Sequence, residues 1–277
     1  MDVRPSTVVL QCFFILEQPH IGGTMYIDAH THLEQFEDNL HVALDIIKKE
    51  KILTLACSMD AESYEFSKAV SKDWELVIPA FGIHPWKASE NLNVLEDYDS
   101  LIREAACIGE IGLDFYWDKN KENYLAQYKV FEYMLDRCKK YGKVSNIHTK
   151  GAEKEVLSSI KSFDIKPPII HWYSGPKDIL TKLIDFGCSF TISVDAGISP
   201  AAGELIDYVP LKQILTETDG PGSLLCVNGK YGYPDEVKNI VKEVAEIKKK
   251  DVAEMTEIIE ENFYEKLNID FKEREEV

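Results

Sequence analysis

The chain has 277 residues, of which 45% are hydrophobic, so it can bury a substantial core and is not disordered as a whole. No apolar run approaches the ~18 to 20 residues that a membrane-spanning helix needs, so we expect no membrane association. Lys and Arg number 31 against 48 Asp and Glu, a net charge of −17. This balance argues against nucleic-acid binding by overall attraction, but it leaves a local cationic or metal site open.

The first residues differ in character from the rest of the chain. Val8–Leu16 is largely apolar, but the segment lacks the cationic start and the small residues at a cleavage site that a signal peptide requires. We interpret residues 1–24 as an N-terminal extension, either an accessory segment or the result of a start assigned upstream of Met25. The six cysteines are widely spaced without a C-x-x-C pair, which indicates buried free thiols and a cytoplasmic protein.

From residue 25 onward, a short run rich in β-formers is repeatedly followed by a longer amphipathic segment. In chain order, the predicted strands are Tyr26–Ala29, Ile52–Cys57, Leu76–Phe81, Ala106–Glu110, Lys143–His148, Pro168–His171, Ser189–Ser193 and Gln213–Glu217. Helical patterns between and after them include Leu40–Glu50, Glu122–Lys140, Pro234–Lys249 and Val252–Leu267.

Buried strands that alternate with helices indicate a parallel sheet covered on both faces. Eight such units fit an α/β fold of the (β/α)8 or TIM-barrel type, which we expect to occupy residues 25–277 as a single domain. A doubly wound open sheet is the alternative, but no G-x-G-x-x-G follows the first predicted strand. The sequence therefore favours the barrel.

Histidines and carboxylates gather where predicted strands end. Four of the seven histidines and two acidic residues have such positions, namely His30, His32, Glu110, His148, His171 and Asp219. In a barrel, all these positions lie at the rim formed by the C-terminal ends of the strands, where active sites are built. His30 and His32 also have the two-residue period of a strand, so both imidazoles project to the same side.

Six nitrogen and oxygen ligands are more than one four-coordinate ion can use, which points to two divalent metal ions. No thiolate is among them, so Zn, Mg and Mn all suit the set. Two ions about 4 Å apart can generate hydroxide from water and stabilise both oxygens of a phosphoryl displacement. Glu110 is best suited to bridge them, because each carboxylate oxygen can bind one ion. We therefore predict a metal-dependent hydrolase.

Several stretches resemble the TatD family of metal-dependent deoxyribonucleases, which belongs to the amidohydrolase-like barrels. They are DAHTHLEQF, GIHPW, IGEIGLDFYW, NIHTKGAEKEVL, IIHWYSG and TETDGP, in the family's order from about Tyr26 to the C-terminal helix. The resemblance implies a nuclease in which His30, His32 and Asp219 hold one metal, His148 and His171 hold the second, and Glu110 bridges. It also implies that Asp219 orients or deprotonates the attacking water.

The resemblance gives two further residues a place near the substrate. His84 matches a family histidine that faces the substrate phosphate or an additional metal, and Lys150 stands where the family commonly has an arginine. Lysine retains the positive charge but lacks the bidentate fork of arginine. The SLLCVNGKYGYP segment also departs from the family pattern after Asp219, so the substrate preference is open.

Other polar and aromatic residues near the predicted ligands have two possible roles each. Asp114 either orients a ligand histidine or caps the following segment, and we expect Glu217 to pair with Lys150 or to lie near the substrate. Four aromatic residues that follow the ligand-bearing strands either stack on bases or pack on the rim, namely Tyr116, Trp117, Trp172 and Tyr173.

The expected substrate is DNA, cleaved at strand ends or in short single strands. A metal-dependent hydrolase of an amide or ester, such as an aminoacyl-tRNA linkage, is the alternative, because the same ligands can support attack on carbon. A third possibility is a subunit within a larger assembly. The AEKEVL and HWYSG stretches resemble a TatD-like branch that includes subunits of antiphage defence systems, which implies such subunits as partners.

Overall fold

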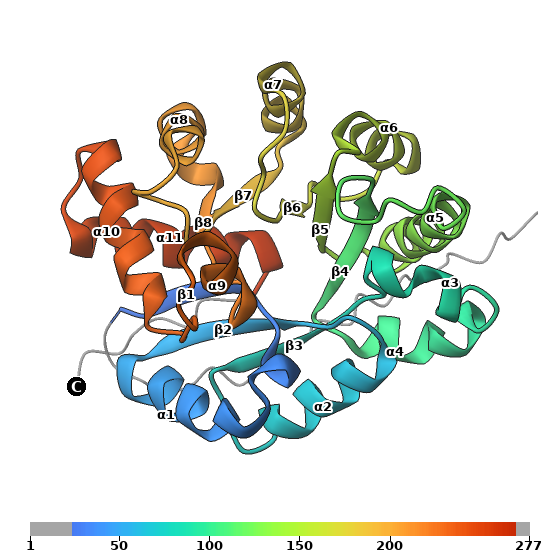
Figure 1. Cartoon of the computed structure of the whole chain (residues 1–277), viewed down its shortest axis with the longest axis horizontal. Coiled ribbons are helices and arrows are strands. Elements are labelled where there is room, and N and C mark those ends of the chain that lie inside the picture. Colours follow the sequence, from blue (N-terminus) through green and yellow to red (C-terminus); the bar gives the residue numbers. More distant parts are fainter. Residues whose placement is uncertain (1–23, 270–277) are drawn as a thin grey trace, which may run out of the picture.

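The computed structural model describes residues 24–269, and eight parallel strands form a barrel surrounded by helices over this range (Figure 1). The strands are β1 (Tyr26–Thr31), β2 (Ile52–Cys57), β3 (Val77–Phe81), β4 (Cys107–Asp114), β5 (Ser145–Lys150), β6 (Ile169–Ile170), β7 (Ser189–Ile192) and β8 (Ile214–Thr216). Each strand pairs in parallel with the next, from β1 to β8. The predicted (β/α)8 architecture is confirmed.

The helices follow the strands as the sequence pattern predicts. The α-helices are α1 (Leu40–Glu50), α2 (Ala61–Ser71), α3 (Ala88–Asn91), α4 (Asp99–Glu104), α5 (Tyr124–Tyr141), α6 (Glu153–Phe163), α7 (Lys177–Phe186), α8 (Pro200–Tyr208), α9 (Gly222–Asn228), α10 (Glu236–Lys248) and α11 (Val252–Leu267). Short 3-10 segments cover Leu33–Asn39, Pro85–Lys87, Leu95–Tyr98 and Leu211–Gln213.

Local sequence explains individual elements. All six residues of β2 are buried, as expected for a strand that is covered on both faces of the sheet. The first turn of α2 is fixed by a capping box, in which the Asp60 side chain accepts from the Ser63 amide and the Ser63 hydroxyl accepts from the Asp60 amide. Helix α5 ends at Gly142, whose φ of 62° is readily adopted by glycine.

The first and last strands meet at the C-terminal end of the barrel. The Asp219 amide donates to the His30 carbonyl at 2.9 Å, and the His32 amide donates to the Gly220 carbonyl at 3.1 Å. Further down, the Thr216 hydroxyl donates to the Ile27 carbonyl at 2.6 Å. These bonds close the ring and place residues that follow β1 beside residues that follow β8.

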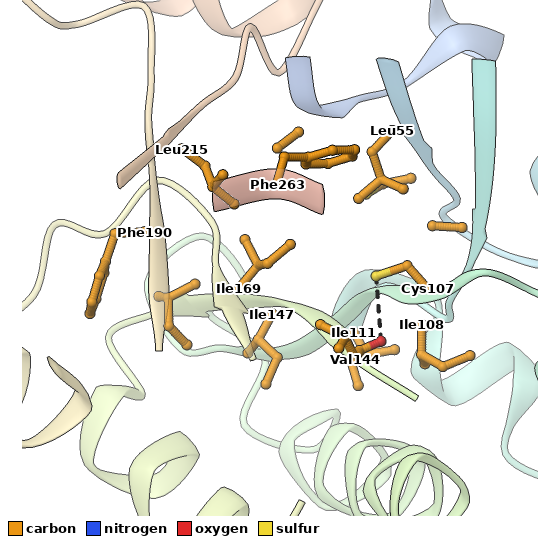
Figure 2. Close-up of a cluster of buried hydrophobic side chains, with 14 of the residues drawn as sticks. Leu55, Cys107, Ile108, Ile111, Val144, Ile147, Ile169, Phe190, Leu215 and Phe263 are labelled. Atoms are coloured by element: carbon orange, nitrogen blue, oxygen red, sulfur yellow. Dashed lines mark hydrogen bonds between the residues drawn. The ribbon is translucent and has the colours of Figure 1, made fainter. Parts of the chain in front are cut away.

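Helix α11 covers the opposite end. Asn262 donates to the carbonyl of Ile214, the first residue of β8, and Glu260 accepts from the amide of Met25, just before β1. Figure 2 shows Phe263 of α11 among core side chains that include Leu55 and Leu215, and Phe263 is fully buried. The barrel is therefore filled by apolar side chains and covered at its N-terminal end, which leaves the C-terminal rim for chemistry.

The main differences from the predicted elements lie at their ends. Strand β4 continues past Glu110 to Asp114, because the GLD stretch goes on pairing with β5. The expected extension, residues 1–24, lies outside the described residues except for its last position.

Of the five cysteines in the described part, all are free and four are buried, but Cys226 is exposed. No helix among residues 24–269 is both long and apolar enough to span a membrane.

Candidate metal centre

The six predicted metal ligands converge at the C-terminal rim. His30 lies near the end of β1, Glu110 in β4 and His148 in β5. His32, His171 and Asp219 follow β1, β6 and β8 within three residues. The side chains of all but Asp219 are almost fully buried, and that of Asp219 is 17% exposed. Residues separated by nearly two hundred positions are thus gathered at one place by strand pairing.

The Glu110 carboxylate lies at the middle of the cluster, and its two oxygens face different histidines. Oε2 lies 3.3 Å from His30 Nε2 and 3.2 Å from His32 Nε2. Oε1 lies 2.7 Å from His148 Nδ1 and 3.8 Å from His171 Nε2. This division into two sets is the arrangement expected of a carboxylate that bridges two cations.

Asp219 lies on the solvent side of the same cluster. Its Oδ1 is 3.7 Å from His30 Nε2 and 3.6 Å from His32 Nε2, and its Oδ2 is 3.9 Å from His171 Nε2. The backbone of Asp219 has a φ of 45°, which is uncommon for a residue other than glycine. Such a conformation is kept only where neighbouring bonds hold it, and here the amide donates to the His30 carbonyl.

Hydrogen bonds on the outer side of the cluster fix how three of the imidazoles present their nitrogens. His30 Nδ1 lies 2.9 Å from Asn146 Oδ1, and His32 Nδ1 lies 3.2 Å from the Cys57 carbonyl oxygen. His171 Nδ1 lies 2.8 Å from Glu217 Oε2. The Asn146 and Cys57 oxygens only accept, as does the Glu217 carboxylate when it is ionised, so Nδ1 carries the proton in each neutral ring. The unprotonated Nε2 atoms therefore point into the cluster, as in histidines that bind metals.

His148 has the opposite ring orientation, with Nδ1 instead of Nε2 directed into the cluster. Its Nε2 lies 3.1 Å from Asp114 Oδ2, while its Nδ1 faces Glu110. Asp114 also accepts from the Trp86 indole at 2.8 Å and, through Oδ1, from the amides of Tyr116 and Trp117. Asp114 thus does both things that the sequence leaves open, since it orients a histidine and caps the loop after β4.

The electrostatics of the cluster favour positive charge. Burial alone would lower the pKa of His32, but the hydrogen bond to Glu110 and the negative charges of Glu110 and Asp219 together raise it. Burial likewise opposes protonation of His148, yet its bonds to Asp114 and Glu110 raise its pKa. Burial alone would raise the pKa of Glu110, but the surrounding histidines outweigh this effect and hold the pKa well below its usual range.

The donor set fits divalent metal ions. His30 Nε2 and His32 Nε2 lie only 3.2 Å apart, and both face Glu110 Oε2, so lone pairs converge where only a cation or a proton relieves their repulsion. Three groups in the described part of the chain have ligand atoms close enough to hold an ion: His30, His171 and Glu217; His30, His32 and Glu110; and His84, Glu110 and His148. All are nitrogen and carboxylate sites, which suit Zn, Mn or Mg.

The two residues expected near the substrate border the cluster. His84 Nδ1 accepts from the Trp86 amide, so the neutral ring carries its proton on Nε2, which lies 3.6 Å from Glu110 Oε1. Burial holds the pKa of His84 well below its usual range. Lys150 Nζ donates to the Trp172 carbonyl at 2.6 Å and to the Ser174 hydroxyl at 3.1 Å. His84 is therefore a neutral donor beside Glu110.

The structure narrows the alternatives left open for Glu217 and Tyr173. Within the described residues Glu217 makes no ion pair with Lys150, because its carboxyl group is held beneath the cluster by His171 and is fully buried. Tyr173 is only 5% exposed and donates to the Pro176 carbonyl, so it packs in the rim and offers no free face for stacking. Tyr116 and Trp117 are exposed, as a stacking role requires.

The family model described as "TatD related DNase" matches residues 27–268, which is most of the chain and contains the whole cluster. The chain belongs to this family.

Curated relatives match this TatD-family chain over most of its length. An uncharacterized metal-dependent hydrolase of Methanocaldococcus jannaschii, MJ1582, is 27% identical and the match covers 86% of this chain and 94% of that protein. A putative deoxyribonuclease of Danio rerio, tatdn3, is also 27% identical, over 71% of this chain and 80% of that protein. The first of these names describes a metal-dependent hydrolase and the second a putative deoxyribonuclease.

Solved structures show the same fold. The crystal structure of YjjV, a TatD homologue of Escherichia coli K12, superposes with a TM-score of 0.80 at 19% sequence identity, covering 88% of this chain and 98% of that one. At this identity the likeness concerns the barrel alone.

Sequence reasoning missed two parts of the TatD-family site. Asn146 fixes the His30 imidazole, and its own Nδ2 donates to the Ala29 carbonyl. Its position two residues before His148 on one strand is a usable signal, since alternate residues share a face. The Cys57 carbonyl that accepts from His32 leaves no trace in the sequence, because any residue supplies a carbonyl.

Proposed function

We propose that the protein is a divalent-metal-dependent phosphodiesterase that hydrolyses DNA, at strand ends or in short single strands. The observation that carries the proposal is the division of the Glu110 oxygens between two sets of histidines. The family description and the name of the zebrafish relative support DNA as the substrate.

The residues present fit two ions. His30, His32 and Asp219 would hold one, His148 and His171 would hold the other, and Glu110 would contribute one oxygen to each. When bound, two divalent cations supply Lewis-acid stabilisation of phosphoryl oxygens and lower the pKa of water.

The acidic chain can attract phosphate at this place. Two divalent cations with Glu110 and Asp219 leave a local charge of about +2, within a chain whose net charge is −17. The overall repulsion is screened beyond roughly 10 Å at ordinary salt, whereas the local charge acts at contact distance. We therefore expect modest affinity with a shallow salt dependence, unlike that of a protein that binds long duplexes.

Side chains of this protein supply the other parts of the reaction. Asp219 is the exposed carboxylate of the cluster, so it orients the attacking water and accepts its proton. The Nε2–H of His84 and the Lys150 ammonium lie at the edge of the cluster and donate to phosphate oxygens. Lys150 binds as a point charge, so it tolerates more than one phosphate orientation.

The test compares substrates in the presence of Mg²⁺, Mn²⁺ or Zn²⁺. Purified protein is incubated with end-labelled single- and double-stranded DNA, with RNA and with a charged tRNA, alongside the Glu110→Gln variant. Glu261→Gln is the matched control, because Glu261 is exposed on α11 at the other end of the barrel. Metal-dependent shortening of DNA by wild type and control, lost in Glu110→Gln, supports the proposal. Deacylation of tRNA without shortening of DNA would overturn it in favour of ester hydrolysis.

A further inference from the structure

A second hollow opens beside the metal centre, between the segments that follow β6 and β7. It is a cavity of about 170 Å³. Its walls include Trp172, Leu180, Ser193, Asp195, Ala202 and Tyr208. Trp172 and Asp195 follow β6 and β7, so this part of the wall lies at the same end of the barrel as the metal ligands, and other parts of the wall come from β7, α7 and α8.

Trp172 connects this cavity to the metal centre, because it lines the cavity and contacts a predicted metal ligand. It directly follows His171, and the centroids of the two rings are 6.2 Å apart. Lys150 Nζ lies 5.0 Å from the indole centroid. The ring that lines the cavity is therefore also in contact with the candidate phosphate-binding lysine.

The Trp172 indole is fixed in place. Its amide donates to the Thr191 hydroxyl, and its Nε1 donates to Asp195 Oδ1, both at 3.1 Å. The backbone φ of 35° at Trp172 is unusual for a bulky residue and is maintained by these bonds. A rigid ring of this kind is suited to stacking, because no conformational freedom is lost when a planar ligand binds.

The remaining walls combine apolar surface with a few hydrogen-bond acceptors. Leu180 and Ala202 are buried and apolar, whereas Asp195 brings a carboxylate to the wall. Ser193 is 1% exposed, and its Oγ has no hydrogen-bond partner among residues 24–269. Buried polar atoms are normally paired, and a donor group bound in the cavity would pair this hydroxyl. An aromatic face with acceptors at its edge matches a nucleobase better than an aliphatic side chain.

We propose that this cavity is a subsite for the base of a nucleotide adjacent to the scissile phosphate. The inference rests on the proposed function and specifies its substrate. The base stacks on Trp172, and its exocyclic amino group donates to Asp195 or to the Ser193 hydroxyl. Adenine, cytosine and guanine carry such an amino group and thymine does not, so thymine is the least favoured base at this position.

The experiment removes one base at a time from the substrate. A set of short single-stranded DNA oligonucleotides carries an abasic residue at successive positions around the cleaved bond, and kcat/KM is measured for each. Ala202→Phe fills the cavity. Gly203→Phe is the matched control, because it adds the same ring to the same helix where nothing lies within 4 Å of the new Cβ atom.

The wild type and Gly203→Phe should lose about tenfold in kcat/KM when the base is removed at one position, within the range known for base–aromatic stacking. In Ala202→Phe the ratio of intact to abasic substrate should fall to near one. In Asp195→Asn, the preference for amino-bearing bases over thymine at that position should disappear. Because each ratio is taken within one variant, a partly unfolded preparation does not mimic the result.

Two results overturn the inference, and they are distinguishable. If the wild type cleaves DNA but no single position is sensitive to base removal, or if Ala202→Phe keeps the wild-type ratio, the cavity is not a base subsite while the proposed function stands. If the wild type shows no metal-dependent cleavage of intact or abasic DNA, the proposed function fails and the inference fails with it.

Discussion

Replacing Glu217 by glutamine should change metal affinity and the stability of the metal-free protein in opposite directions. Glu217 Oε2 accepts from His171 Nδ1 at 2.8 Å, and the carboxyl group is fully buried. Glutamine keeps the shape and an acceptor oxygen but removes the charge. Hydrogen bonds to charged groups contribute about 1.5 to 3 kcal/mol against about 0.5 to 1.5 for neutral ones, so the variant loses about 1 kcal/mol of support for His171. Metal should therefore bind roughly five- to tenfold more weakly, near the lower end of the range for such outer partners.

The stability effect has the other sign. Burial raises the pKa of Glu217 to about 7, so the folded metal-free protein disfavours the ionised form. The resulting cost is absent below the unfolded-state pKa, grows as the pH rises toward 7, and is complete above it. It amounts to about 3 kcal/mol at most, and glutamine does not incur it. The metal-free variant should therefore be more stable than the wild type at about pH 8 and no more stable at about pH 4.

Titration calorimetry with Mn²⁺ or Zn²⁺ measures the affinity, and urea unfolding with chelator measures the stability. Glu261→Gln is again the control, since it removes one carboxylate from the exposed side of α11. The reasoning is refuted if Glu217→Gln binds metal as tightly as the wild type. It is refuted equally if the variant is less stable than the wild type without metal at about pH 8, because then the carboxylate contributes to the fold directly.

Three more outcomes follow from the structure. Metal binding should release more protons at about pH 6 than at about pH 8, because the raised pKa values of His32 and His148 keep both residues protonated at the lower pH when no metal is bound. Calorimetry in buffers of different ionisation enthalpy measures the number of protons released, and an equal number at the two pH values would contradict the prediction. Phe263→Ala should cost about 3 to 5 kcal/mol in urea unfolding, since the ring is fully buried at the closed end of the barrel, while metal affinity stays unchanged. Lys150→Met should raise KM for DNA at least several-fold with a smaller effect on kcat; a change in kcat alone would show that the ammonium does not bind ground-state phosphate.

The sequence predicted the barrel and the convergence of the cluster because both follow from periodicity. Eight strand-and-helix units admit few topologies, and in a parallel barrel the strand ends meet at one rim. His148 and His171 could thus be brought together without knowing any distance. The predicted strand ends too early at Glu110, because the pairing with β5 continues through the GLD stretch to Asp114.

What the sequence could not give depends on contacts across the barrel. The hydrogen bond from His30 to Asn146 joins positions 116 residues apart, and no local pattern links them. Pairing with Lys150, one of the two roles that the sequence leaves open for Glu217, does not occur in the described residues, because the carboxyl group is buried against His171. The cavity beside Trp172 arises from how two loops and their helices pack, which periodicity does not specify.

The most direct test of the metal centre is anomalous diffraction from crystals of the protein grown with Mn²⁺ or Zn²⁺, recorded at the absorption edge of the metal. Two peaks are expected on either side of the Glu110 carboxylate, one bounded by His30, His32 and Asp219 and the other by His148 and His171. Density without an anomalous peak at this position, in crystals that contain the metal, would contradict the account.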